Sequence, residues 1–312
     1  MKKKYVFPCK KPLLSLFIIS LLISCVQREE WNSSTLLYFD TLCEIKLRCR
    51  QEKFNSILEE INTLFFRIEE LFSPDSSISE TRELIELYEI AKKVYYDSDG
   101  AFDISIAPLS LLWGFHNPPC RVPKHDEIMR ILKSVGLDKV KIKGSELSIS
   151  PGMSFDWGGI AKGFGVDLAS KLCREKQILH GFINAGGDLF CWGNNPQGQL
   201  WRIGIKHPRE EGFLGVLSLT ETGAATTGDY QRYFIKDDIR YHHVLDPKTG
   251  YPAKGKQSVT VIGPETVFCD ALSTAIFVSE TPEKIMQKYS EYSAVIVDSD
   301  GQLSFFGKKI NF

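Results

Sequence analysis

The chain has 312 residues, of which 43% are apolar and 25% are charged, the balance of an ordinary globular protein. Its formal net charge is -1, so electrostatics give no support to a nucleic-acid partner, and none is expected. The length suits one large domain or two small ones.

The N-terminus has the pattern of a bacterial lipoprotein signal. Lysines precede a short apolar run over 13–23, which is too short for a transmembrane span and typical of a signal-peptide core. Ser24 and Cys25 follow, and a small residue directly before a cysteine resembles a lipobox. We therefore expect a signal peptide over 1–24, a lipid on Cys25, a polar tether over 25–34 and a domain over 35–312.

This signal predicts a lipid-anchored protein at the bacterial cytoplasmic membrane, on its periplasmic or other extracytoplasmic face. The alternatives are a secretory signal with an incidental cysteine, or an uncleaved anchor. The later cysteines show neither a Cys-x-x-Cys pair nor zinc-ligand spacing. In an exported protein they are compatible with one or two disulfides or with buried free thiols.

Helical periodicity dominates the first half of the chain. The elements expected there are a strand over 36–47, helices over 52–72 and 81–96, a turn over 74–77, an apolar stretch over 101–116 and a helix over 125–135. Strands then alternate with turns over 140–150, and a helix is expected over 160–175.

Strand and turn patterns dominate from Gly181 onward. Two more helices are expected over 270–278 and 281–289, and the last strands over 294–297 and 303–306. Helices early and strands late favour an α+β fold, with a mixed β-sheet core and flanking helices, over a doubly wound sheet.

Five polar segments could carry chemistry. The first opens the helix expected over 160–175, where paired glycines let backbone amides approach an anion and Lys162 adds a positive charge. Its spacing fits neither a Walker A nor a Rossmann motif. The alternative is a glycine turn with a solvated lysine. The segment reads Asp156-Trp157-Gly158-Gly159-Ile160-Ala161-Lys162-Gly163.

The second segment, Asn184-Ala185-Gly186-Gly187-Asp188, suggests a bulge or a close backbone approach, or else a simple strand kink. The third places hydroxyls beside a glycine, which suits phosphate oxygens, although a tight turn with exposed hydroxyls is a common alternative. It reads Thr226-Thr227-Gly228-Asp229-Tyr230.

The fourth segment starts with His242 and His243 and continues through Val244 into the turn Asp246-Pro247-Lys248-Thr249-Gly250. Adjacent strand residues face opposite sides, so the histidines make a poor metal chelate. His242 reads as an exposed residue. His243 reads as a structural histidine more readily than as a proton shuttle.

The fifth segment contains Asp270 and Thr274, which share one face if the segment is helical. A carboxylate with hydroxyl or carbonyl oxygens suits a hard cation such as Mg²⁺ bound to phosphates. Taken alone, Asp270 is better explained as a helix N-cap.

In this order, the five segments resemble the ApbE family of FAD:protein FMN transferases. The likeness runs from about residue 36 to residue 308 and includes Gly100-Ala101-Phe102-Asp103, Pro108-Leu109 and Trp113-Gly114-Phe115. It implies an FAD-binding α+β fold and Mg²⁺-dependent transfer of FMN to a threonine of an acceptor redox protein, with release of AMP. The alternatives are an FAD pyrophosphatase giving FMN and AMP, or a non-catalytic FAD-binding lipoprotein.

The resemblance also implies roles for individual residues. Asp270, Thr274 and the carbonyl of Gly159 match the metal site, and Asp270 and His243 match catalytic positions. The positions that match contacts to FAD are Phe39, Ala101, Phe102, Asp103, Asp156, Lys162 and Val244. The chain departs from the family at Phe39-Asp40-Thr41, where Met-Gly-Thr is common, and after Phe72, where the loop is shortened and has no obvious tyrosine to stack on the flavin.

Overall fold

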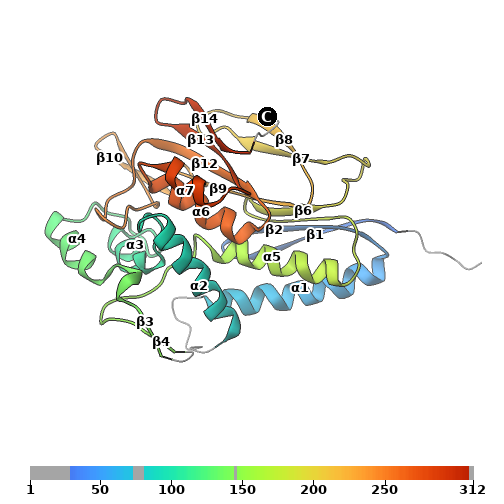
Figure 1. Cartoon of the computed structure of the whole chain (residues 1–312), viewed down its shortest axis with the longest axis horizontal. Helices are drawn as coiled ribbons and strands as arrows, with labels where there is room; N and C mark the ends of the chain where they lie inside the picture. The colour runs from blue at the N-terminus through green and yellow to red at the C-terminus, as the bar shows by residue number, and fades with distance from the viewer. Residues whose placement is uncertain (1–28, 73–80, 144–145, 309–312) are drawn as a thin grey trace, which may run out of the picture.

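The computed structural model describes residues 29–72, 81–143 and 146–308 (Figure 1). The predicted signal peptide, Cys25 and the predicted turn after Phe72 lie outside these residues. The helices are α1 (Gln51–Leu71), α2 (Arg82–Asp97), α3 (Ala107–Trp113), α4 (His125–Ile131), α5 (Ala161–Glu175), α6 (Thr266–Val278) and α7 (Pro282–Lys288). The strands are β1 (Glu30–Tyr38), β2 (Thr41–Cys49), β3 (Lys141–Lys143), β4 (Glu146–Ser148), β5 (Gly181–Ala185), β6 (Asp188–Trp192), β7 (Trp201–Lys206), β8 (Phe213–Leu219), β9 (Thr222–Gly228), β10 (Tyr233–Lys236), β11 (Ile239–His242), β12 (Lys256–Gly263), β13 (Ser293–Asp298) and β14 (Leu303–Gly307).

The core of the fold is an eight-stranded sheet in the order β1-β2-β5-β6-β9-β12-β13-β14. The predicted α+β class is confirmed, but the expectation of a mixed sheet is wrong. All of the pairings in this sheet are antiparallel. Three of them are hairpins between consecutive strands, and such short connections can only reverse the chain.

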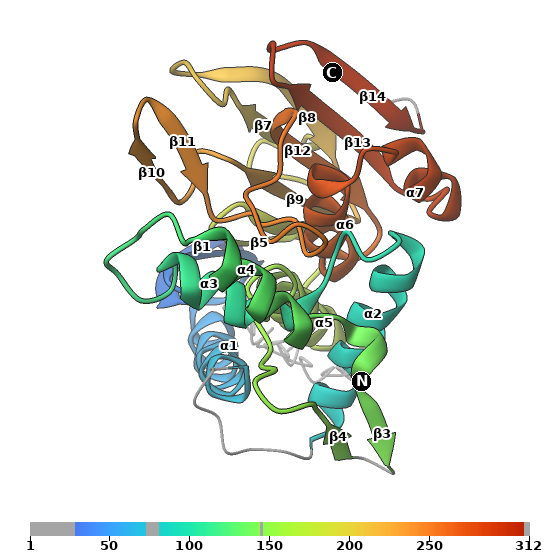
Figure 2. The same ribbon diagram turned by 90° about the vertical axis from the view of Figure 1, so that its left-hand side faces the viewer.

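The two faces of the sheet are covered differently. Helices α1, α5 and α6 lie along one face (Figure 1). Their apolar stripes meet inward residues of the sheet such as Ile45 and Ile183. The β7–β8 ribbon covers the other face (Figure 2). There the rings of Phe182 and Trp201 stack at 5.1 Å. Segments far apart in sequence therefore meet where α5 and α6 contact the centre of the sheet.

The strand expected over 36–47 is a hairpin that begins earlier and turns at Phe39 and Asp40. Both turn residues have positive φ angles, 57° and 56°. Phenylalanine is unusual in that conformation, so the sequence carried no turn signal. The tether boundary at residue 34 was also wrong, because residues 30–34 pair with β2 and the buried Asn32 amide donates to the carbonyl of Cys49 at 2.9 Å.

The six cysteines of the described segments are free thiols, and all but Cys120 are buried. Burial raises the pKa of the Cys173 and Cys191 thiols to about 12, which keeps them protonated and unreactive. Of the two readings, buried thiols rather than disulfides fit the structure. Within the described ranges, none of the helices combines the length and apolar character needed to cross a membrane.

Candidate active site

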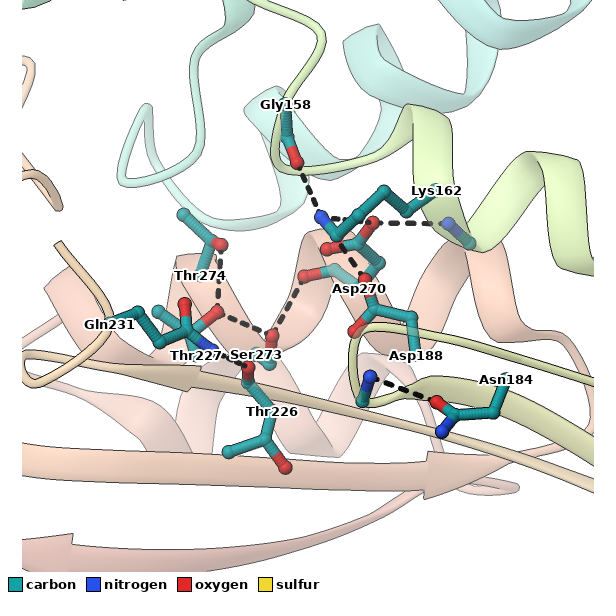
Figure 3. A network of polar contacts seen from close by, with 12 residues as sticks. Gly158, Lys162, Asn184, Asp188, Thr226, Thr227, Gln231, Asp270, Ser273 and Thr274 are labelled. Atoms are coloured by element: carbon teal, nitrogen blue, oxygen red, sulfur yellow. Dashed lines mark hydrogen bonds and ion pairs between the residues drawn. The ribbon is translucent and has the colours of Figure 1, made fainter. Parts of the chain in front are cut away.

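Lys162 lies at the centre of a buried polar cluster at the start of α5 (Figure 3). Its Nζ donates to the carbonyl of Gly158 at 2.8 Å. It also lies 3.1 Å from a carboxylate oxygen of Asp188 and 3.8 Å from one of Asp270. The first, second and fifth sequence segments are thereby brought together. The solvated-lysine reading is wrong, since the Lys162 side chain is only 25% exposed.

A glycine at position 163 allows α5 and α6 to approach closely enough to form this cluster. A Cβ there would lie 2.6 Å from the carbonyl oxygen of Thr266 and 2.9 Å from the Cβ of Asp270. The Gly163 amide instead donates to the Asp270 carboxylate at 3.2 Å. Asp270 lies inside α6, which begins at Thr266, so the N-cap reading is wrong.

The N-terminus of α6 is capped by Asp167, a residue of α5. Its two carboxylate oxygens accept hydrogen bonds from the amides of Thr266 and Val267, each at 2.9 Å. This bidentate contact satisfies two otherwise unpaired amides and fixes α6 against α5. It therefore sets the position of Asp270 relative to Lys162.

We expect Asp167→Ala to lower the free energy of unfolding by about 1–2 kcal/mol, because both amides lose their acceptor. Asp167→Asn keeps one acceptor oxygen and should lose less. Urea unfolding followed by circular dichroism measures both variants. Equal stability of the alanine variant and the unmodified protein would contradict the capping role.

Two buried carboxylates share the single lysine. Asp188 and Asp270 are each only 4% exposed. Burial, followed by the charge of Asp188, raises the pKa of Asp270 to about 7. Burial alone would lower the pKa of Lys162, but the charges of Asp188 and Asp270 outweigh it and raise that pKa. The cluster therefore has an excess of negative charge that a further cation would neutralise.

Asp188 was not among the site residues predicted from the sequence. It follows the β5–β6 hairpin turn, where Gly186 and Gly187 have φ angles of 64° and 112° and Asn184 accepts from the Gly187 amide. The bulge and kink readings of this segment are therefore replaced by a hairpin turn. The only feature of the sequence that could have indicated Asp188 is that this acidic residue directly follows two glycines. The buried Asp188 Oδ2 makes no hydrogen bond to another described residue and is held by the ion pair with Lys162 Nζ at 3.1 Å.

A group of hydroxyls lies beside the carboxylates. Thr227 of β9 contacts Ser273 and Thr274 of α6, with oxygen–oxygen distances of 2.7 and 3.0 Å. A Cβ on Gly159 would lie 3.5 Å from Thr274 Oγ1, so the glycine turn covers this hydroxyl. Gly159, Asp270 and Thr274, the three predicted metal-site residues, thus gather around one small region. Thr226 and Thr227 lie in β9 rather than in the tight turn that was the alternative.

His116 contacts the glycine turn and was missed by the sequence analysis. Its Nε2 lies 2.6 Å from the Asp156 carboxylate, which also accepts from the Gly158 amide at 2.9 Å. The hydrogen bond to Asp156 raises the pKa of His116. Burial would raise the pKa of Asp156, but the contact with His116 outweighs it and lowers that pKa. Asp156 therefore holds the turn that presents Gly158 to Lys162.

The first of the two adjacent histidines differs from expectation. His242 is buried, not exposed, with Nε2 2.9 Å from the carbonyl of Ala253 and its ring against Phe277. His243 and Val244 lie just beyond the end of β11. Burial, with the charges of His242 and Arg232, lowers the pKa of His243 to about 4.

The residues expected at the flavin end are largely buried. Ala101, Phe102, Asp103 and Val244 are each at most 6% exposed. Asp103 caps the short helical turn that follows it, accepting from the amide and hydroxyl of Ser105 at 2.8 and 2.6 Å. Phe39 packs inward, where its ring would lie 3.1 Å from a Cβ on Gly165. Their contacts to FAD stay predictions.

No group of three His, Cys, Asp or Glu side chains in residues 29–72, 81–143 and 146–308 is arranged to hold a metal ion. A cation bound at this cluster would therefore need hydroxyl, carbonyl or substrate oxygens as well as the carboxylates. Hard cations accept such mixed oxygen ligands.

Known proteins resemble this chain over most of its length. Residues 39–296 match the model of a family described as the ApbE family. A Haemophilus influenzae protein named FAD:protein FMN transferase is 33% identical over 192 residues, covering 58% of this chain and 56% of that protein. A Treponema pallidum protein of the same name is 28% identical over 278 residues, covering 78% and 77%. The first curated relatives are matched over only 56%, 63% and 56% of their own length.

Solved structures show the same architecture. The ApbE protein of Thermotoga maritima has a TM-score of 0.81 and 31% identity, covering 88% of this chain and 96% of that one. The flavinyl transferase ApbE of Pseudomonas stutzeri has a TM-score of 0.78 and 26% identity, covering 90% and 96%. These neighbours agree with the α+β assignment.

Proposed function

The chain belongs to the ApbE family, and from this we propose that it is an FAD:protein FMN transferase. In the proposed reaction, a threonine oxygen of an acceptor protein attacks the phosphorus of the FMN half of FAD. The bond from that phosphorus to the bridging oxygen breaks, AMP leaves with the oxygen, and the threonine loses its proton. No nucleophile on the enzyme is needed, because phosphoryl transfer depends mainly on positioning and charge neutralisation.

The observation that carries this proposal is the cluster of Lys162, Asp188 and Asp270 beside the Thr274 hydroxyl. Two buried carboxylates with one lysine leave negative charge that an additional hard cation would neutralise. In this proposal Asp270, Thr274 and the Gly159 carbonyl hold Mg²⁺. When bound, Mg²⁺ supplies Lewis-acid stabilisation of charge on the phosphate oxygens.

Lys162 and the amides at the start of α5 supply the remaining positive potential for a diphosphate. Lys162 is fixed by the Gly158 carbonyl, so its charge is positioned before FAD binds. Its raised pKa keeps it protonated at neutral pH.

In this proposal, His243 assists removal of the threonine proton. Its Nδ1 lies 3.3 Å from the Arg232 carbonyl, which can only accept, so Nδ1 carries the hydrogen and Nε2 has a free lone pair. The lowered pKa of about 4 keeps the ring neutral at pH 7. Such a ring is a weak base, consistent with assisting rather than initiating the reaction.

The test is incubation with FAD, Mg²⁺ and a threonine-containing acceptor domain, followed by gel separation under denaturing conditions. We expect flavin fluorescence on the acceptor and none when its threonine is replaced by valine. A matched reaction without acceptor measures free FMN and AMP. Release of both products there, with no labelling in the complete reaction, would identify a pyrophosphatase instead.

We also propose that Cys25 carries lipid and holds the protein on the extracytoplasmic face of the bacterial membrane. The support is the sequence up to Cys25 and the start of β1 at Glu30, which leaves a short link. We expect Cys25→Ser to move the protein from the membrane fraction to the soluble fraction. Retention of the variant in washed membranes would contradict lipidation.

A further inference from the structure

Three hydroxyl groups form a chain whose direction can be worked out from one end. Ser273 Oγ lies 2.8 Å from the carbonyl oxygen of Asp270. A carbonyl oxygen can only accept, so the single hydroxyl hydrogen of Ser273 is used in this bond. Ser273 must therefore act as the acceptor toward any other hydroxyl.

The next two bonds follow from the first. Thr227 Oγ1 lies 2.7 Å from Ser273 Oγ, so Thr227 donates in this contact. Its only hydrogen is then used, and in the 3.0 Å contact with Thr274 Oγ1 the donor is Thr274. Hydrogen bonds thus run from Thr274 to Thr227, then to Ser273, and end on the Asp270 carbonyl.

Because the hydroxyls of Thr227 and Ser273 are buried, water does not compete for the hydrogen bonds between them. Ser273 is 0% and Thr227 7% exposed, whereas Thr274 is partly exposed. Thr227 lies in β9, where it is paired with Val259 of β12, so it is held on a rigid strand while its two partners are held on α6. Figure 3 shows the three hydroxyls in a row next to Asp270.

The order matters because Thr274 uses its hydrogen on the side facing Thr227. Its free oxygen lone pairs are then directed away from Thr227. Hydrogen bonding to neighbouring groups commonly fixes the orientation of metal ligands in this way. With the opposite order, Thr227 would donate to Thr274 and occupy one of those lone pairs.

We propose that Thr227 and Ser273 are positioning residues that orient the Thr274 hydroxyl as a ligand for a divalent cation. This rests on the proposed Mg²⁺-dependent function. It adds two residues that do not themselves contact the cation. Hydrogen bonds in a chain also polarise one another, which makes the Thr274 oxygen a better electron-pair donor.

The test compares Mg²⁺ binding by Thr227→Val and Thr227→Ser, without FAD or acceptor. Valine keeps the shape of threonine and removes the hydroxyl, whereas serine keeps the hydroxyl. Calorimetric Mg²⁺ titration and the Mg²⁺-dependent rise in melting temperature give two readouts independent of activity. We expect Mg²⁺ affinity to fall about 10–100-fold in the valine variant, the effect typical of losing a group behind a metal ligand, and to stay near normal in the serine variant.

Ser273→Ala provides a second route if the valine variant does not fold. Without its acceptor, the Thr227 hydroxyl can turn to donate to Thr274, so Mg²⁺ affinity should again fall. Thr274→Ala is the reference for losing the ligand itself. Unchanged Mg²⁺ affinity in the folded Thr227 or Ser273 variants, with a loss in Thr274→Ala, would overturn the positioning role of Thr227 and Ser273. It would leave the proposed metal site in place. Unchanged affinity in Thr274→Ala would overturn the metal site and the chain together.

Discussion

Replacing Asp270 with asparagine is expected to lower the rate of FMN transfer by about 100-fold or more, while the fold stays intact. Asparagine has nearly the same shape and can still accept the hydrogen bond from the Gly163 amide. It has no negative charge with which to hold a cation beside Lys162. Labelling of an acceptor at saturating FAD and Mg²⁺ measures the loss.

The same substitution should not weaken the metal-free protein at pH 8. Burial, followed by the charge of Asp188, raises the folded-state pKa of Asp270 to about 7. Between its ordinary value near 4 and about 7, the folded protein binds a proton that the unfolded chain does not, so this group's contribution to stability falls as pH rises. Asparagine does not ionise, so the variant does not lose this stability as pH rises. Retained transfer, or a variant clearly less stable than the unmodified protein at pH 8, would contradict this role.

Replacing Lys162 with methionine is expected to have the largest effect on stability. Asp188 and Asp270 are buried and lose the ammonium group 3.1 and 3.8 Å away. Breaking a buried ion pair in this way typically costs about 3–5 kcal/mol. Urea unfolding at pH 8 without metal measures the change.

The loss should be smaller at pH 5 than at pH 8, because the raised pKa of Asp270 lets its carboxylate take up a proton and become neutral there. The double variant Lys162→Met with Asp188→Asn should recover part of the lost stability, since one uncompensated charge is removed. An equal loss at both pH values, with no recovery in the double variant, would contradict the charge balance described for the cluster.

The long helices could be predicted from sequence because their apolar residues are periodic. Helices α1, α2 and α5 begin and end within one or two residues of expectation. Helix α6 begins four residues before the predicted Asp270, because its cap comes from Asp167 in another helix. A cap supplied across the fold leaves no local signal, and neither does a hairpin turn made by Phe39 and Asp40.

The site was predictable only in part for the same reason. Lys162, Asp270, Thr274 and Gly159 stand in recognisable glycine-rich or helical segments, and the fold brings them together. Asp188 and Thr227 act through contacts with residues from distant elements, which spacing along the chain cannot reveal. At the flavin end around Phe39 and Phe102, the roles come from the family resemblance, and the contacts to FAD stay predictions.

Mass spectrometry of the acceptor measures covalent FMN transfer at the Asp270 end of the site. After incubation with FAD, Mg²⁺ and this protein, the acceptor should gain the mass of one phosphoester-linked FMN on a threonine-containing peptide. The Asp270→Asn protein should leave the acceptor mass unchanged. An unmodified acceptor with the intact protein, or equal modification by both proteins, would contradict FMN transfer that depends on Asp270.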